Sequence, residues 1–137
     1  MPVMRCLAAL LAALVLAGCG MRAEEVAPDE VVEFLLTSAA SDFHAHRPPD
    51  PARFRDVRIG HVKMPGGDKQ YRMCGQFLPA QEEGAVEWVP FATIKTSGYE
   101  QLIGGQAASY CQGSSFVWNQ GGDLSSFLQS RLDSLRR

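Results

Sequence analysis

The sequence predicts an α+β fold, in which an N-terminal helix, an antiparallel meander of three to four strands and a C-terminal helix form one domain. Two observations lead to this prediction. Apolar residues recur at helical spacing over residues 28–44 and again over residues 123–135. Between these segments lie short runs rich in aromatic and β-branched residues, separated by turn-forming Gly, Pro and Asp. This pattern is typical of a small sheet covered by terminal helices.

The first 18 residues have the build of a secretory signal peptide. A short region with one basic residue, Arg5, precedes an apolar run that ends in small residues. A transmembrane helix is the alternative, but the uncharged run from Cys6 to Cys19 is shorter than the roughly 20 residues that span a bilayer. We therefore expect residues 1–18 to be a signal peptide rather than a span.

The segment closes on Leu16-Ala17-Gly18-Cys19, which resembles the lipobox of bacterial lipoproteins. The resemblance implies cleavage before Cys19, attachment of acyl chains such as palmitate to its thiol, and acylation of the new amino group. Several chains would make a stable anchor, because a single chain binds a membrane only marginally. Gly20 rather than Asp follows, and by resemblance to enterobacterial sorting this favours the periplasmic leaflet of the outer membrane. An ordinary signal peptide with an incidental cysteine is the alternative.

Residues 19–27 are then expected to be a short membrane tether, and residues 28–137 a single globular domain. The formal net charge of −2 argues against a nucleic-acid binder. Acids predominate over residues 24–50, and basic residues over residues 51–72. The basic residues there are Arg53, Arg55, Arg58, Lys63, Lys69 and Arg72. They could face anionic lipid or lipopolysaccharide, but we favour a solvated strand face that the acidic helix beside it complements.

The helix over residues 28–44 is predicted to be amphipathic. Pro28 suits its first turn, and Asp29 and Glu30 place negative charge where the helix dipole favours it. Its apolar residues fall on one side, which we expect to pack in the core. They are Val31, Val32, Leu35, Leu36, Ala39, Ala40 and Phe43.

A hairpin is predicted to follow the helix. Residues 47–51 contain three prolines and form a rigid connector. Residues 54–64 are expected to form a strand with a bulge at Gly60, where the apolar pattern changes phase. A turn at residues 65–68 joins this strand to a second one over residues 71–78.

The third strand is expected over residues 86–96, after a polar turn at residues 81–84. Pro90 argues for an edge position, because proline cannot donate to a strand ladder. Residues 99–111 are ambiguous, since their apolar residues have near-helical spacing but two consecutive glycines interrupt them. Residues 116–118 are read as a short strand.

The C-terminal helix is predicted from Asp123, which suits its cap, to about Leu135. Its apolar stripe consists of Leu124, Phe127, Leu128, Leu132 and Leu135. We expect Leu128 to be buried on the sheet, because an isolated helix this short is marginal in water. Arg131 interrupts the stripe and is expected to keep its head group in water. The alternative is an exposed helix that docks a partner.

Two of the four cysteines are expected to form a disulfide. Cys6 would leave with the signal peptide and Cys19 would be lipidated, so Cys74 and Cys111 are left in an oxidising compartment. Cys74 has the opposite strand parity from Met73. The bond would therefore tie a segment to the other side of the sheet.

A metal site is the alternative use of these cysteines, with His44, His46 or His61 as further ligands. It is disfavoured, because the chain has no Cys-x-x-Cys pair and because His44 and His46 would be neighbours only in an extended strand. We therefore predict no metal and no cofactor.

A second resemblance concerns the stretch Asp50-Pro51-Ala52-Arg53-Phe54-Arg55-Asp56-Val57-Arg58 and the later Arg72-Met73-Cys74-Gly75-Gln76. Together they are similar to a pattern in small exported bacterial proteins of uncharacterised activity. The resemblance implies the same kind of fold and adds no function.

Catalytic motifs are absent from the sequence, which has no Gly-x-Ser-x-Gly, Walker loop, His-Glu-x-x-His or dinucleotide fingerprint. We assign no catalytic residue. The expected function is a non-enzymatic binding or scaffolding lipoprotein at the periplasmic face of the membrane, with an envelope protein as partner. A periplasmic inhibitor or immunity lipoprotein is the alternative, and an enzyme acting on cell wall or lipid is disfavoured.

Overall fold

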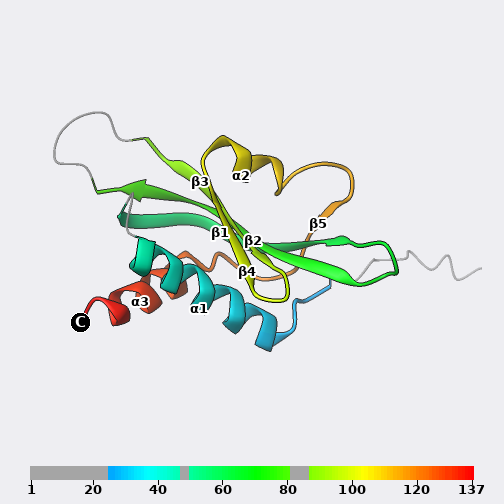
Figure 1. Cartoon of the computed structure of the whole chain (residues 1–137), viewed down its shortest axis with the longest axis horizontal. Helices are drawn as coiled ribbons and strands as arrows, with labels where there is room; N and C mark the ends of the chain where they lie inside the picture. The colour runs from blue at the N-terminus through cyan, green and yellow to red at the C-terminus, as the bar shows by residue number, and fades with distance from the viewer. Residues whose placement is uncertain (1–24, 47–49, 81–86) are drawn as a thin grey trace, which may run out of the picture.

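The structure of the protein is a computed structural model that describes residues 25–46, 50–80 and 87–137. Within these ranges five strands and three helices follow one another along the chain (Figure 1). Their bounds are α1 Asp29–His46, β1 Pro51–Lys63, β2 Lys69–Pro79, β3 Val89–Lys95, β4 Tyr99–Ile103, α2 Gly105–Ser109, β5 Phe116–Trp118 and α3 Ser125–Leu135. The predicted signal peptide, Cys19 and the polar turn at residues 81–84 lie outside the described residues.

The strands form an antiparallel sheet in the order β4-β3-β2-β1-β5. Strands β1 to β4 are a meander, and β5 returns to pair with the free edge of β1, where Val117 lies opposite His61. The predicted α+β fold is therefore confirmed. The sheet exceeds the three to four strands expected, because the ambiguous segment divides into β4 and the short helix α2.

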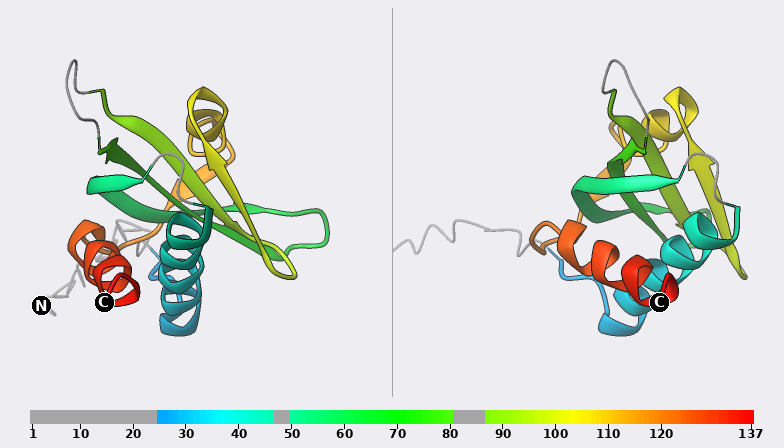
Figure 2. Two further views of the ribbon diagram at one scale, coloured as in Figure 1. Left: turned by 60° about the vertical axis from the view of Figure 1, so that its left-hand side comes forward. Right: turned by 90° about the vertical axis from the view of Figure 1, so that its left-hand side faces the viewer.

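The sheet has an inner face, which α1 and α3 cover, and an outer face, over which α2 lies (Figure 2). Alternate residues of each strand point to the two faces. The register places Ile59 opposite Met73 on the inner face and Arg58 opposite Cys74 on the outer face. None of the helices in the described ranges is long and apolar enough to cross a membrane.

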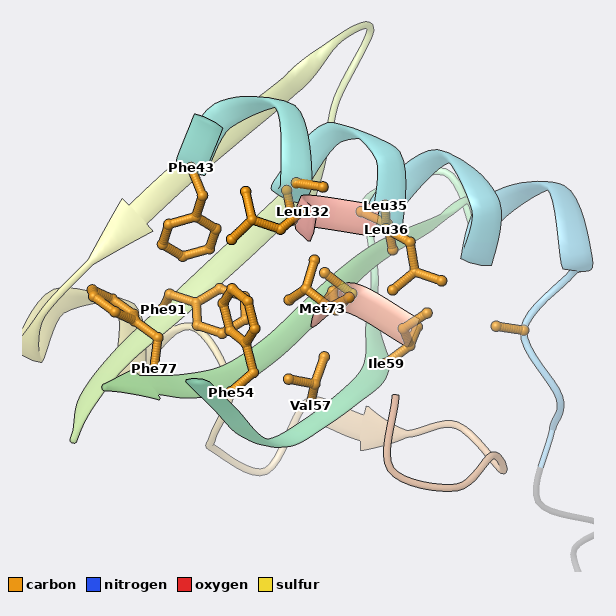
Figure 3. Packing of buried hydrophobic residues seen from close by; sticks show 14 residues of the cluster. Leu35, Leu36, Phe43, Phe54, Val57, Ile59, Met73, Phe77, Phe91 and Leu132 are labelled. Carbon is orange, nitrogen blue, oxygen red and sulfur yellow. The ribbon is translucent and has the colours of Figure 1, made fainter. Parts of the chain in front are cut away.

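The core lies between the inner face and the two covering helices (Figure 3). The ring of Phe43 from α1 makes edge-to-face contacts with three rings from the strands. The centroid distances are 5.3 Å to Phe54, 5.1 Å to Phe77 and 5.2 Å to Phe91. Edge-to-face pairs stabilise the fold beyond the area that they bury. The apolar side predicted for the first helix thus packs in the core.

Helix α3 packs beside α1 on the inner face. Leu128 and Leu132 have no exposed surface, so the expected burial of Leu128 is confirmed. Phe127, in contrast, is 61% exposed, and Leu135 is also exposed. The buried part of the stripe is therefore narrower than the sequence suggests.

Arg131 connects α3 to α1 through its guanidinium group. Nη1 donates a hydrogen bond to Thr37 Oγ1 at 2.9 Å, and Nη2 pairs with the carboxylate of Glu33. The sequence predicts that the head group lies in water, whereas in the structure it contacts two side chains of α1. It uses one of the acidic side chains of α1.

The pairing of β1 with β2 shifts register between Pro51 and Arg53 and again at Asp56, so the bulge predicted at Gly60 is wrong. Arg55 pairs with Gln76 and Arg58 pairs with Cys74, which leaves one extra residue in β1 between these pairs. Asp56 accordingly has a positive φ of 54°. The register is regular at Gly60, so the phase change of the apolar pattern at this residue has a different cause.

Strand β3 is an interior strand, so the edge position predicted from Pro90 is also wrong. The carbonyl of Pro90 accepts a hydrogen bond from Gly104, the residue directly after β4, at 2.8 Å. The β3–β4 pairing begins one residue later, at Phe91. Proline is tolerated because its missing donor falls at the end of the ladder.

The first described residues are held at the end of the sheet that carries the β1–β2 turn (Figure 1). Val26 forms a bridge with Gln120, whose N–H donates to the carbonyl of Glu25 at 3.0 Å. Asn119 Nδ2 donates to the same carbonyl at 2.9 Å. The side chain of Glu25 pairs with Lys69, and this hydrogen bond holds the pKa of Glu25 below its ordinary value. Backbone and side chain together tie residue 25 to the sheet.

Candidate functional site

The cysteine pair predicted from the sequence is bonded. Cys74 and Cys111 form a disulfide with their Cα atoms 6.2 Å apart. Cys74 lies on the outer face among Ala92 and Ala107, which are also buried. The bond thus ties the segment after α2 to β2 on the face away from α1 and α3, as the strand parity predicts.

The three histidines considered as metal ligands lie on two elements, α1 and β1. His44 and His46 lie in the last turn of α1. His61 is buried in β1, where its Nδ1 donates to Asn119 Oδ1 at 2.9 Å. In the part of the chain that the structure describes, no three His, Cys, Asp or Glu residues are grouped so that they could hold a metal ion.

A Ser–Asp pair lies at the start of α3, beside an open hollow of about 380 Å³. Asp123 Oδ1 accepts the N–H groups of Ser125 at 2.9 Å and of Val57 at 3.1 Å, as well as the Ser125 hydroxyl. Burial would raise the pKa of Asp123, but hydrogen bonds from Ser125, Val57 and Asp56 outweigh it and hold the pKa below its ordinary value. Such a carboxylate is a weak proton acceptor. The pair joins β1 to α3, and Asp123 binds the first N–H of this helix, close to its predicted role as a cap.

Four arginines share the outer face of the sheet. Arg53, Arg55 and Arg58 belong to β1, and Arg72 belongs to the neighbouring β2. In a regular strand Arg55 and Arg58 would point to opposite faces, because they are an odd number of residues apart. The extra residue at the Asp56 bulge returns Arg58 to the outer face.

Each of these guanidinium groups lies over an aromatic ring. The distances from the guanidinium carbon to the ring centroid are 4.2 Å for Arg55 and 5.7 Å for Arg53 over Trp88, 4.4 Å for Arg58 over Trp118, and 5.1 Å for Arg72 over Tyr110. Contacts within about 6 Å are attractive and contribute roughly 0.5 to 1 kcal/mol each at exposed sites. We call this surface the arginine–aromatic face. It consists of Arg53, Arg55, Arg58, Arg72, Trp88, Tyr110 and Trp118.

Strand β5 brings Trp118 to Arg58. Trp118 lies opposite Gly60 in the β1–β5 register, and its ring meets that of Phe116 edge to face at 4.8 Å. A Cβ at residue 60 would clash with the Phe116 ring, so glycine allows β5 to lay its aromatic side chains across β1. Phe116 also lies opposite Val62. The outer face is therefore apolar at this point, which explains the phase change in the sequence without a bulge.

Arg72 differs from the other three arginines because its donors are already used. Its Nη1 donates to the carbonyl of Tyr110 at 2.8 Å, and its Nε and Nη2 donate to Gln70 Oε1 at 3.1 and 2.8 Å. Burial lowers the pKa of Arg72 from its ordinary value, and Tyr110 acts in the opposite direction. A guanidinium stays protonated in either case. Arg72 thus fixes the segment after α2 to the sheet.

Arg53, Arg55 and Arg58, by contrast, are exposed. Among the described residues the only hydrogen bond of their guanidinium groups runs from Arg55 Nε to Gln76 Oε1, at 2.6 Å. Their only ion pair there is a long one, 3.9 Å from Arg55 Nε to Asp56 Oδ2. Most of their N–H groups are therefore available to an anionic ligand.

The acidic helix does not complement these arginines, so our interpretation of the basic stretch is wrong for them. Helix α1 lies against the inner face, and its Glu33 pairs with Arg131 of α3. Lys69, from the same basic stretch, pairs with Glu25, which precedes α1. The charge on the outer face is separated from α1 by the sheet itself.

The sequence contained the elements of this face but not their arrangement. The sequence contains the basic stretch and the aromatic residues, yet no local pattern places them on one surface. The local signal for this face is an arginine at every second residue, Arg53 and Arg55.

Comparison with models of protein families, with curated proteins and with solved structures gives no match for the chain.

Proposed function

We propose that the protein is a lipid-anchored, non-enzymatic binding protein of the bacterial envelope, which holds a partner at the periplasmic face of the membrane, more specifically at the outer membrane. The proposed binding surface is the arginine–aromatic face. The observation that carries the proposal is the row of exposed guanidinium groups on this face, which lie over rings and lack close acidic partners among the described residues. Arg, Trp and Tyr are the residues that contribute most to the affinity of protein interfaces.

The rings give this surface a further property of binding sites. An arginine that lies over a ring has fewer conformations open to it than one in free solution, so binding costs it less side-chain entropy. Trp88 and Trp118 are only partly exposed, and their rings support the arginines rather than project from the surface. Both features are typical of a surface that binds a partner rather than of one that only keeps the protein soluble.

The anchor part of the proposal predicts that Cys19→Ser releases the protein from the membrane. Without the thiol no acyl chains can be attached, and the remaining chain would partition into the aqueous phase. Detergent phase partitioning measures this directly. Cys6→Ser, which changes the other N-terminal cysteine, is the matched control and should stay in the detergent phase. A Cys19→Ser protein that also stays there would overturn the lipoprotein assignment.

The binding part predicts that cross-linking in intact envelopes captures a partner through the outer face. A variant with Arg53→Gln, Arg55→Gln and Arg58→Gln should lose this capture but remain folded, although loss of three exposed cation–π contacts, at roughly 0.5 to 1 kcal/mol each, should lower its unfolding midpoint. A host protein in stoichiometric amount would support a scaffolding role. A foreign hydrolase or toxin would support the inhibitor or immunity role instead. Capture that the triple substitution leaves unchanged would contradict the proposed surface.

A further inference from the structure

The ligand class of the arginine–aromatic face follows from its geometry, and the inference rests on the function proposed above. We propose that this face binds an extended polypeptide segment with carboxylate side chains at alternate positions, which lies along β1 and pairs with Arg53, Arg55 and Arg58. Three features of the face support this ligand: the donor groups of the arginines, the spacing of the arginines along β1 and the burial of the apolar side chains.

The donor geometry suits carboxylates. Arg55 and Arg58 place the guanidinium carbon 4.2 and 4.4 Å from the centroid of a tryptophan ring. Apart from Arg55 Nε, which donates to Gln76 Oε1, the N–H groups of these two guanidinium groups have no hydrogen-bond acceptor among the described residues and are free to donate. A guanidinium edge binds a carboxylate with two parallel hydrogen bonds, whereas an ammonium acts as a point charge.

The spacing suits an extended chain. Residues on one face of a strand repeat about every 6.6 to 6.8 Å, and alternate side chains of an extended peptide repeat at the same distance. Arg53 and Arg55 have this spacing, and the bulge keeps Arg58 in the same row. A segment with acids at every second position could therefore pair with all three arginines without bending away from the sheet.

The apolar residues of this face argue against a membrane as the ligand. Amphipathic segments that lie in a membrane surface insert projecting apolar side chains into the headgroup region. Leu78 and Ile94, which share the outer face through their register with Arg53 and Arg72, are buried, and Trp88 and Trp118 are partly covered. The groups left to a ligand are cationic and polar.

The surroundings of the row are rigid. Arg72 holds the carbonyl of Tyr110 at 2.8 Å, and the next residue, Cys111, is bonded to Cys74 of β2. The segment beside the row is thus fixed to the sheet at two adjacent residues before any ligand binds. Preorganisation of this kind raises affinity, because less order has to be created on binding.

The test measures binding to the full protein, solubilised in a neutral detergent. The probe is a fluorescent ten-residue peptide of alternating Glu and Ser, and the control peptide has Gln in place of Glu. We expect anisotropy to detect binding of the acidic peptide only, with an affinity that falls as salt is added. The Arg55→Gln and Arg58→Gln double variant should weaken this binding by about tenfold or more. Lys63→Gln with Arg137→Gln removes the same charge elsewhere and should change the affinity by less than about twofold.

The outcomes separate this inference from the function on which it rests. Equal binding by the double variant and the wild type would overturn the assignment of the ligand to this face. Failure to bind the acidic peptide, together with binding to vesicles that contain anionic phospholipid, would replace the peptide with a membrane surface. If the triple variant loses capture in envelopes but the wild type binds no acidic peptide, the proposed function stands and the ligand class is wrong. If capture is unchanged in that variant, the proposed function itself fails.

Discussion

Replacing Leu128 by Ala should lower the free energy of unfolding by about 2 to 5 kcal/mol, the range found for fully buried leucines. Its side chain has no exposed surface and lies in the core beneath α1. Truncation leaves a cavity that α3 can fill only by moving relative to α1 and the sheet. Urea unfolding of the isolated protein, followed by tryptophan fluorescence, measures the change.

The neighbouring residue provides a matched control for this substitution. Phe127 is on the same helix but 61% exposed, so Phe127→Ala should change the free energy of unfolding by no more than about 0.5 kcal/mol. An unchanged midpoint for Leu128→Ala, combined with lost partner capture, would instead make α3 a docking helix. That result would revive the alternative interpretation of the C-terminal stripe.

Loss of the disulfide should cost about 2 to 4 kcal/mol of unfolding free energy. The bond joins residues 37 positions apart, so it restricts a long loop of the unfolded chain. The variant to use carries Cys74→Ala and Cys111→Ala, because alanine leaves no polar group at the buried position of Cys74. Chemical unfolding under non-reducing conditions compares it with the wild type.

Mass spectrometry of the non-reduced protein provides the second measurement for this bond. We expect a linked pair of peptides that contain Cys74 and Cys111. Two thiols that alkylate in the folded protein without denaturant would contradict the structure. Reduced wild type should match the double alanine variant in stability, which separates the effect of the bond from that of the substitutions.

The helices were predictable because each has one buried side, so their apolar residues repeat with a helical period. Strands covered on both faces do not give a comparable signal. In β1, Val62 is apolar on the outer face because Phe116 lies opposite it, and this created the appearance of a bulge at Gly60. The structure has a bulge at Asp56, and because this residue is charged, its positive φ does not change the pattern of apolar residues.

The candidate binding face was less predictable than the fold, because it depends on contacts between distant residues. Arg58 joins Arg53 and Arg55 only through the bulge, and it meets Trp118 only because β5 crosses to the far edge of the sheet. Neither feature can be derived from the residues around Arg58 alone. The disulfide was predictable for the opposite reason, since it followed from the cysteines left after the N-terminal segment was accounted for.

The attachment of Glu25 to the sheet has a consequence for how an anchored molecule would stand on its bilayer. Glu25 is tied to Lys69 and Gln120, at the end of the sheet that carries the β1–β2 turn. From Cys19 to Glu25 a chain reaches at most about 20 Å, which is roughly half the length of β1, about 43 Å at 3.3 Å per residue. The β1–β2 turn would therefore be held nearer the bilayer than Arg53, which lies at the opposite end of β1. The arginine row along β1 would then extend away from the lipid, and a partner would approach it from the side of the domain.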